Sequence, residues 1–242
     1  MKCCAVIPTY NHDLHIAGVV RSLKSKGLEV FIVDDASEPG SHKRLVEIAH
    51  KEQATLLVHQ ENQGKGGAVM TGLKAAEAAG FSHALQVDAD GQHNLDDVTA
   101  MLEVSKRHPD KLVSGRPVYD ASIPKGRLYG RYVTHFWVWI ETLSFAIKDT
   151  MCGFRVYPLA SCAELFSKVS LGKRMDFDIE VMVRLYWQGV DVAFVPTKVI
   201  YPEDGTSHFQ GFKDNVRISW LHTRLFFGML PRIPSLLMRK AR

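Results

Sequence analysis

Short apolar runs alternate with segments of helical periodicity along the first third of the chain, and this alternation limits the possible folds more than any other feature. Continuous apolar strands separated by helices of about 10 to 15 residues predict βαβ units and a largely parallel sheet with helices on both faces. The predicted fold class is α/β, with three layers built around a mostly parallel central sheet. We expect strands over residues 3–11, 29–35, 54–60 and 83–90, with helices over 16–26, 43–53 and 65–79.

The second half is less regular, but it shows no linker and no internal repeat. A length of 242 residues and a hydrophobic content of 46% suit one sizeable core. We therefore expect one domain over residues 1–220, followed by a separate segment over 221–242. Further strands are predicted over residues 111–118, 151–158 and 190–202, and further helices over 129–147 and 177–188.

The segment 221–242 is basic and amphipathic. After His222 it contains Lys and Arg but no acid, interleaved with Leu, Phe and Met. This pattern suits either an anionic membrane surface or a solvated tail. The longest apolar stretch, residues 132–147, is shorter than the roughly 20 residues that a membrane span needs, so no transmembrane helix is expected.

The cysteines and the N-terminus indicate the compartment. Cys3, Cys4, Cys152 and Cys162 have no metal-ligand spacing, which suits buried thiols in a reducing environment. The apolar run before Pro8 is too short for a signal peptide. We expect a cytoplasmic protein that lies peripherally at the inner face of the membrane.

Polar side chains gather where the predicted strands end. Ligands of open α/β sheets bind at the carboxyl ends of the strands, so these side chains should meet along one edge. The polar clusters are Thr9–Asn11, Asp34 with Asp35, Asn62–Gly66, and Asp88–Gln92.

Asp88 and Asp90 are the candidate metal ligands. Residues i and i+2 of an extended chain point the same way, and Gly91 lets the chain turn immediately afterwards. Oxygen ligands suit Mg²⁺, which one or two carboxylates usually hold together with substrate phosphates. Gln92 would add a neutral oxygen. The alternative is a pair of acids at an ordinary strand-end turn.

The two other clusters could bind a nucleotide. Asp34 and Asp35 could accept hydrogen bonds from a nucleoside, or they could cap a helix with the help of Ser37. The turn Gly64–Gly67 leads into a predicted helix, so its backbone N–H groups and Lys65 could meet an anion. It has neither the P-loop spacing nor the G-x-G-x-x-G pattern, which disfavours a Walker-type nucleotidase.

Taken in order, "IPTYN", "VDDAS", "NQGKGGA" and "DADGQH" resemble the successive motifs of family-2 nucleotide-sugar glycosyltransferases. The later "DTMCGFRVY", "FDIEVMVRL" and "YPEDGTSHF" resemble the branch of dolichyl-phosphate mannosyltransferases and polyprenyl-phosphate glycosyltransferases, so the resemblance covers roughly residues 5–209. It implies a Rossmann-like three-layer sandwich of the glycosyltransferase A type, with residues 1–220 as the catalytic domain. It also implies a nucleoside diphosphate sugar as donor, Mg²⁺ or Mn²⁺, and inversion at the anomeric carbon.

The resemblance also implies roles for individual residues. Asp88, Asp90 and Gln92 would hold the metal, and Asp90, Asp178 and Arg116 would take part in catalysis. The acceptor or its phosphate would meet Arg116, Arg131, Ser207 and His208, although Arg116 and Arg131 could equally be surface ion-pair members and His208 could have no chemical role. The donor would be bound by Pro8, Thr9, Tyr10, Asn11, Asp35, Lys65 and Asp88.

Whether the acceptor is a hydroxyl or a phosphate depends on whether Asp178 acts as a base. A hydroxyl acceptor needs a base to remove its proton, whereas a phosphate acceptor does not. Asp178 and Glu180 diverge by about 200° on a helix, so only one can face the site. Glu180 could simply pair with Arg184. Asp149 could close the site or orient Arg155.

Three functions follow from these patterns. The leading hypothesis is a metal-dependent, inverting transfer of a hexose from a UDP- or GDP-linked sugar to a lipid-linked acceptor such as a polyprenyl phosphate. In the second, the same fold glycosylates a hydroxyl of a glycan or glycolipid, with Asp178 as base. The third is a nucleotide-sugar-binding protein without turnover. The expected partners are the donor, the acceptor and a membrane surface, with no nucleic acid.

Overall fold

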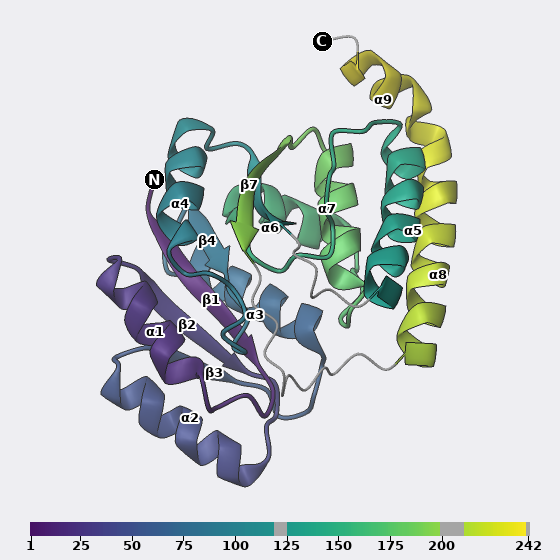
Figure 1. Ribbon diagram of the computed structural model, residues 1–242. Coiled ribbons are helices and arrows are strands. Elements are labelled where there is room, and N and C mark those ends of the chain that lie inside the picture. Colours follow the sequence, from purple (N-terminus) through teal and green to yellow (C-terminus); the bar gives the residue numbers. More distant parts are fainter. Residues whose placement is uncertain (119–124, 199–210, 241–242) are drawn as a thin grey trace.

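A central sheet organises the molecule in the computed structural model, which describes residues 1–118, 125–198 and 211–240 (Figure 1). The strands follow the order β3-β2-β1-β4-β6-β5-β7. All neighbours pair in parallel except β6, which runs antiparallel to both β4 and β5. The strands are β1 (Cys3–Thr9), β2 (Glu29–Asp34), β3 (Thr55–Val58), β4 (His83–Gln86), β5 (Leu112–Val118), β6 (Arg155–Pro158) and β7 (Val192–Lys198).

Helices cover both faces of this sheet. One apolar cluster joins the sheet to α1, α2 and α4, and a second joins the opposite face to α3, α6 and α7. The second cluster also includes buried residues of α5 and α8. The three-layer α/β prediction is confirmed. The helices are α1 (Ile16–Ser25), α2 (Pro39–Lys51), α3 (Lys65–Ala78), α4 (Asp97–Arg107), α5 (Lys125–Thr142), α6 (Leu159–Lys168), α7 (Phe177–Trp187), α8 (Gly211–Met229) and α9 (Ile233–Lys240), with the 3₁₀ turn η1 (Leu230–Arg232) between the last two.

The structure differs from the sequence predictions in several places. No helices were predicted where α8 and α9 lie, α5 ends at Thr142 and not at residue 147, and β6 begins at Arg155 and not at residue 151. The helices α4 and α6 were not predicted, because small or polar residues such as Ser105 and Cys162 occupy part of their buried faces and weaken the apolar periodicity. The strand expected over residues 83–90 ends its pairing at Gln86. The predicted boundary between residues 220 and 221 lies within α8, and the division into a catalytic domain and a C-terminal segment stays a prediction.

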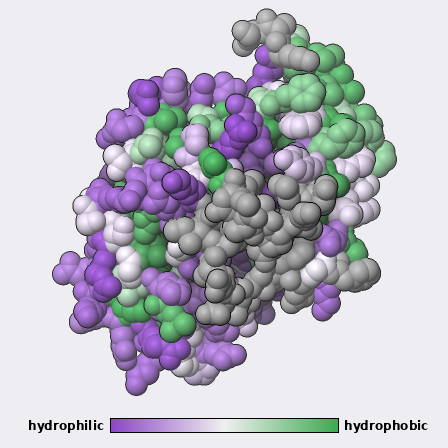
Figure 2. All heavy atoms as spheres, viewed as in Figure 1, coloured by the Kyte–Doolittle hydropathy of each residue, from purple (hydrophilic) through white to green (hydrophobic). Residues whose placement is uncertain are grey.

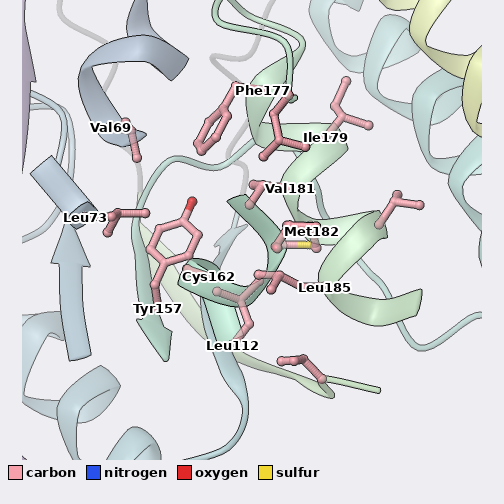
Figure 3. Packing of buried hydrophobic residues seen from close by; sticks show 14 of the residues in the cluster. Val69, Leu73, Leu112, Tyr157, Cys162, Phe177, Ile179, Val181, Met182 and Leu185 are labelled. Atoms are coloured by element: carbon pink, nitrogen blue, oxygen red, sulfur yellow. The ribbon is translucent and has the colours of Figure 1, made fainter. Parts of the chain in front are cut away.

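The second cluster fixes α3 and α7 against the sheet. Figure 3 shows Val69 and Leu73 of α3, Tyr157 of β6 and Phe177 of α7 pointing toward one another. The close approach of the helices depends on Gly66, where an added Cβ would lie 2.3 Å from the Cβ of Phe177. Because Lys65 and Asp178 adjoin these two residues, this packing brings their side chains together.

Gly72 gives a direct test of the packing between α3 and the sheet. A Cβ at this position would lie 2.3 Å from Cγ1 of Val6. Gly72→Ala should lower the free energy of unfolding by about 1–3 kcal/mol through overpacking. Gly18 of α1 is the matched control, because nothing lies within 4 Å of its added Cβ. Gly18→Ala should raise the stability by roughly 0.5–1 kcal/mol. Urea unfolding measures both, and shifts of the same sign would contradict this packing.

Candidate active site

The loops after β1 and β2 are held to each other by hydrogen bonds. Asp35 N donates to Thr9 O at 2.9 Å, and Asn11 N donates to Ser37 Oγ at 3.0 Å. Asn11 has a φ of 56°, a left-handed conformation that asparagine tolerates better than most residues. Asp34 is fully buried and accepts hydrogen bonds from Ser37 N and His42 Nδ1, so it stabilises its own turn.

Asp35 organises the glycine-rich turn. Its carboxylate accepts hydrogen bonds from Gln63 N at 2.8 Å and from Gly64 N at 2.7 Å, and it contacts His59 Nδ1 at 2.7 Å. Gly64 is the N-cap of α3 and has a φ of 92°, a backbone conformation that glycine adopts at little cost. The carboxylate therefore positions the turn from which Lys65 extends.

Lys65 joins two carboxylates from distant parts of the chain. Its Nζ lies 2.9 Å from both oxygens of Asp88 and donates a hydrogen bond to Oδ2. The same Nζ lies 3.3 Å from Oδ2 of Asp178, in the first turn of α7. The site thus brings together three of the predicted residues, Lys65, Asp88 and Asp178.

The charges of this group stabilise one another. Burial opposes the charge of Lys65, but Asp178 and Asp88 outweigh it and raise the pKa of Lys65 above its usual range. Burial likewise opposes the charge of Asp88, but Lys65 and His93 outweigh it and lower the pKa of that carboxyl. At neutral pH the pair is an ammonium and a carboxylate.

Gly153 closes one side of the group. A Cβ added there would lie 2.7 Å from Lys65 Nζ, 2.9 Å from Asp88 Oδ2 and 2.9 Å from Gln86 Nε2. Only a residue without a side chain lets the loop before β6 pass so close to these polar atoms.

Asp88, Asp90 and Gln92 meet part of what a divalent cation requires. Among the described residues, Asp88 Oδ1 is buried and accepts no hydrogen bond, although Lys65 Nζ lies 2.9 Å from it in the ion pair, and Asp90 Oδ1 accepts a hydrogen bond from Gln92 N at 3.0 Å. These hard oxygen donors suit Mg²⁺ or Mn²⁺. In the part of the chain that the structure describes, no group of three or more His, Cys, Asp and Glu could hold a metal ion. A cation here would need further ligands, such as the phosphates of a nucleotide.

Asp149 binds Arg131. Arg131 Nε and Nη2 donate to Asp149 Oδ2 at 3.2 and 3.1 Å, and His135 Nε2 lies 3.6 Å from the same oxygen. Burial opposes the charge of Asp149, but His135 and Arg131 outweigh it and lower its pKa to about 2. Asp149 therefore orients Arg131 and not Arg155, the partner considered from the sequence.

A groove of about 1040 Å³ lies between α5 and α8. The two helices lie side by side at the edge of the molecule (Figure 1). Met151, in the same loop as Asp149 and Gly153, also lines the groove, so one loop contacts both the groove and the Lys65 group. The other lining residues include Arg131, Val133 and Trp137 of α5, and Phe226 and Phe227 of α8.

The remaining predicted residues lie elsewhere or outside the described chain. Pro8 and Thr9 are buried at the end of β1, followed by half-buried Tyr10 and Asn11. Arg116 is exposed near the carboxyl end of β5. Ser207 and His208 lie outside the described residues. The predicted pair of Glu180 and Arg184 is confirmed, with an oxygen of Glu180 2.8 Å from Nε of Arg184.

Sequence reasoning missed His93 and Gly153, and it considered Arg155 only as a partner of Asp149. His93 Nε2 lies 3.4 Å from Asp88 Oδ2, and its ring stacks on Phe154. Its place directly after the "DGQ" motif was an available signal. Gly153 and Arg155 both lie in the quoted "CGFR", but their roles depend on contacts with Lys65 and with α7 that the sequence does not show.

The sheet, its covering helices and the acids at its carboxyl edge define a glycosyltransferase A-type fold. A crystal structure of glucosyl-3-phosphoglycerate synthase from Mycobacterium tuberculosis in complex with UDP matches with a TM-score of 0.69 at 14% identity, covering 94% of this chain and 79% of that one. A crystal structure of Staphylococcus aureus TarS with UDP matches with a TM-score of 0.59 at 16% identity, covering 93% and 65%. At these identities the likeness shows the fold alone.

The chain belongs to glycosyl transferase family 2, whose sequence profile matches residues 4–171. It is 26% identical over 238 residues to the UDP-N-acetylglucosamine–dolichyl-phosphate N-acetylglucosaminyltransferase of Methanococcus voltae, covering 89% of this chain and 94% of the relative. It is 24% identical over 225 residues to the undecaprenyl-phosphate mannosyltransferase of Micrococcus luteus, covering 87% and 88%. The protein is therefore a glycosyltransferase, in agreement with the resemblance found in its motifs.

Proposed function

We propose that the protein is an inverting, metal-dependent glycosyltransferase that moves a hexose from a UDP- or GDP-linked sugar to a polyprenyl phosphate. The observation that carries the acceptor is the apolar groove between α5 and α8, because it includes Arg131 and the loop that reaches Lys65. Such a groove suits an isoprenoid chain, and an oriented guanidinium suits its phosphate. The names of the Methanococcus and Micrococcus relatives support this acceptor class.

The proposed reaction is a single in-line displacement. A phosphate oxygen of the acceptor attacks the anomeric carbon while the bond from that carbon to the nucleoside diphosphate breaks, which inverts the configuration. A phosphate monoester carries about −1.5 to −2 charges at pH 7, so no base has to activate it. Arg116, Arg131, Ser207 and His208 are the proposed acceptor and phosphate contacts.

Asp88, Asp90 and Gln92 would hold Mg²⁺ or Mn²⁺, which would neutralise the charge that develops on the leaving nucleoside diphosphate. A Mycobacterium tuberculosis neighbour of the same fold was crystallised with Mn²⁺ and UDP, which supports this set. Pro8, Thr9, Tyr10, Asn11 and Asp35 would surround the nucleoside, with Lys65 beside the diphosphate.

Residues 221–242 are proposed to hold the enzyme at an anionic bilayer. Figure 2 shows hydrophobic residues over the side of the molecule where α8 and α9 lie. The exposed residues there include Trp220, Phe227, Leu237 and Met238, with exposed Arg232 between the two helices. None of the described helices has the length and apolar character needed to cross a membrane. Lipid contact would leave the groove between α5 and α8 close to the membrane that contains the acceptor.

Asp178→Asn separates the proposed acceptor from the alternative one. With Asp178 as base for a hydroxyl acceptor, the variant should lose about 100- to 10,000-fold in rate. With polyprenyl phosphate as acceptor, it should retain transfer within about tenfold, since the change weakens the contacts of this carboxylate with Lys65 and Arg155 but removes no base that the reaction needs. The assay follows labelled hexose from the nucleotide sugar to polyprenyl phosphate and to free polyprenol.

Arg184→Gln is the control for altering α7, because Arg184 pairs with Glu180 away from Lys65. It should change neither transfer rate. Wild-type transfer only to the hydroxyl, abolished in Asp178→Asn, would overturn the phosphate acceptor in favour of the alternative.

A further inference from the structure

Arg155 is the largest fully buried side chain of the described chain, although it is charged. It lies on β6, the antiparallel strand between β4 and β5. Burying a guanidinium is costly unless hydrogen bonds replace its water. A charge in this position therefore needs a structural reason.

The guanidinium donates its hydrogen bonds mainly to backbone carbonyl oxygens. Nη2 donates to Thr150 O at 2.6 Å, and Nη1 donates to Asp178 O at 2.7 Å. The carboxylate of Asp178 is more distant, with Oδ1 3.8 Å from Nη1. Arg155 thus joins two pieces of backbone that are not adjacent in sequence, and a planar guanidinium suits such two-point bonding better than an ammonium does.

Each of these carbonyls belongs to a different part of the site. Thr150 follows Asp149, which holds Arg131 and also accepts hydrogen bonds from the backbone N–H groups of Met151 and Cys152. In the proposed function, the loop of Asp149 and Arg131 form the side of the site that holds the acceptor.

Asp178 forms the other side. Its carboxylate contacts Lys65, which in turn contacts Asp88. A shift of the first turn of α7 would therefore change the distance between Asp178 and Lys65. A shift of the loop before β6 would move Arg131 and Gly153.

We propose that Arg155 is a positioning residue that fixes the loop of Asp149 to the first turn of α7. It thereby sets Arg131 at the correct distance from the group of Lys65, Asp88 and Asp178. This inference rests on the proposed function for the identity of the two sides. Arg155 would act through its bonds to these two carbonyls, beside a longer contact of Nη1 with the Tyr157 hydroxyl at 3.5 Å.

Methyl signals of labelled methionines test the positioning without any substrate. Met151 lies in the loop, Met182 in α7, and Met101 in α4 on the opposite face of the sheet. In Arg155→Ala the signals of Met151 and Met182 should both shift, while Met101 stays unchanged. Guanidinium, added far below the concentration that unfolds the protein, should return both signals to their wild-type positions, whereas ammonium should not.

Transfer kinetics give the second readout. In Arg155→Ala the kcat should fall about 100-fold, the expected effect of a displacement of about 1 Å. The KM for polyprenyl phosphate should rise about tenfold as Arg131 moves. Guanidinium should restore kcat and KM together.

Arg155→Lys replaces Arg155→Ala in the methyl-signal experiment if the alanine variant does not fold. Lysine fills most of the space of arginine but lacks its planar, two-pronged donor group. Its Met151 and Met182 signals should not both match the wild type. Unshifted signals in both variants, or a rate loss that guanidinium leaves unchanged while the protein stays folded, would overturn the proposal. A wild-type enzyme that transfers nothing to polyprenyl phosphate would instead overturn the proposed acceptor, and the methyl signals would still decide the role of Arg155.

Discussion

Asp90→Asn should reduce hexose transfer by about 100- to 1,000-fold, the effect expected when one group that stabilises developing charge is removed. Asp90 is half-buried, and its carboxylate makes a hydrogen bond to the backbone of Gln92. Asparagine can accept the same bond, so the fold should be kept. The loss would therefore report the missing negative charge, as expected for a metal ligand.

Asp96→Asn is the matched control for this substitution. Asp96 is exposed and lies in the same segment, just before α4. It should leave transfer unchanged. Saturating Mn²⁺ should not rescue Asp90→Asn. Normal transfer by Asp90→Asn would mean that Asp90 is an ordinary turn residue.

The second large effect concerns the membrane. Replacing Trp220 and Phe227 of α8 by glutamate should weaken binding to anionic vesicles by about 100-fold or more, because burying each large apolar side chain contributes roughly 1.5–3 kcal/mol. Both side chains are more than 60% exposed, and η1 and α9 add exposed apolar and basic groups beside them. Co-sedimentation with vesicles of anionic lipid at low salt measures the binding.

Val46→Glu with Val58→Glu is the control pair. These exposed valines lie on α2 and β3, far from α8 (Figure 1). The control variant should bind vesicles as the wild type does. Salt should weaken the vesicle binding of both proteins, since the basic residues also attract the anionic lipid. A wild-type protein that stays in the supernatant would make the C-terminal segment a solvated tail.

The sheet could be predicted from the sequence because its first four strands are continuous apolar runs that helical periodicity separates. Their order in the chain also placed Lys65 and Asp88 at one edge, since parallel strands end on the same side. The short pairing of β4 could not be predicted, because Val87 and Ala89 remain buried and apolar beyond its last paired residue.

The contacts of the site depend on tertiary packing. Asp178 reaches Lys65 because Gly66 lets α3 approach Phe177 closely, and no local pattern encodes that approach. The partners of Arg155 are backbone carbonyls, which leave no residue signature. The groove exists because α8 lies against α5, two helices that the chain separates by β6, α6, α7 and β7.

Calorimetric titration of the protein with UDP and with GDP, each with and without Mn²⁺, tests whether Asp88, Asp90 and Gln92 form a metal-dependent donor site. We expect one of the two nucleotides to bind in a Mn²⁺-dependent manner, and we expect Asp90→Asn to lose this binding while Asp96→Asn keeps it. That result would also identify the class of donor. Binding of neither nucleotide with Mn²⁺, or equal binding by Asp90→Asn, would contradict the metal-dependent donor site at Asp88, Asp90 and Gln92.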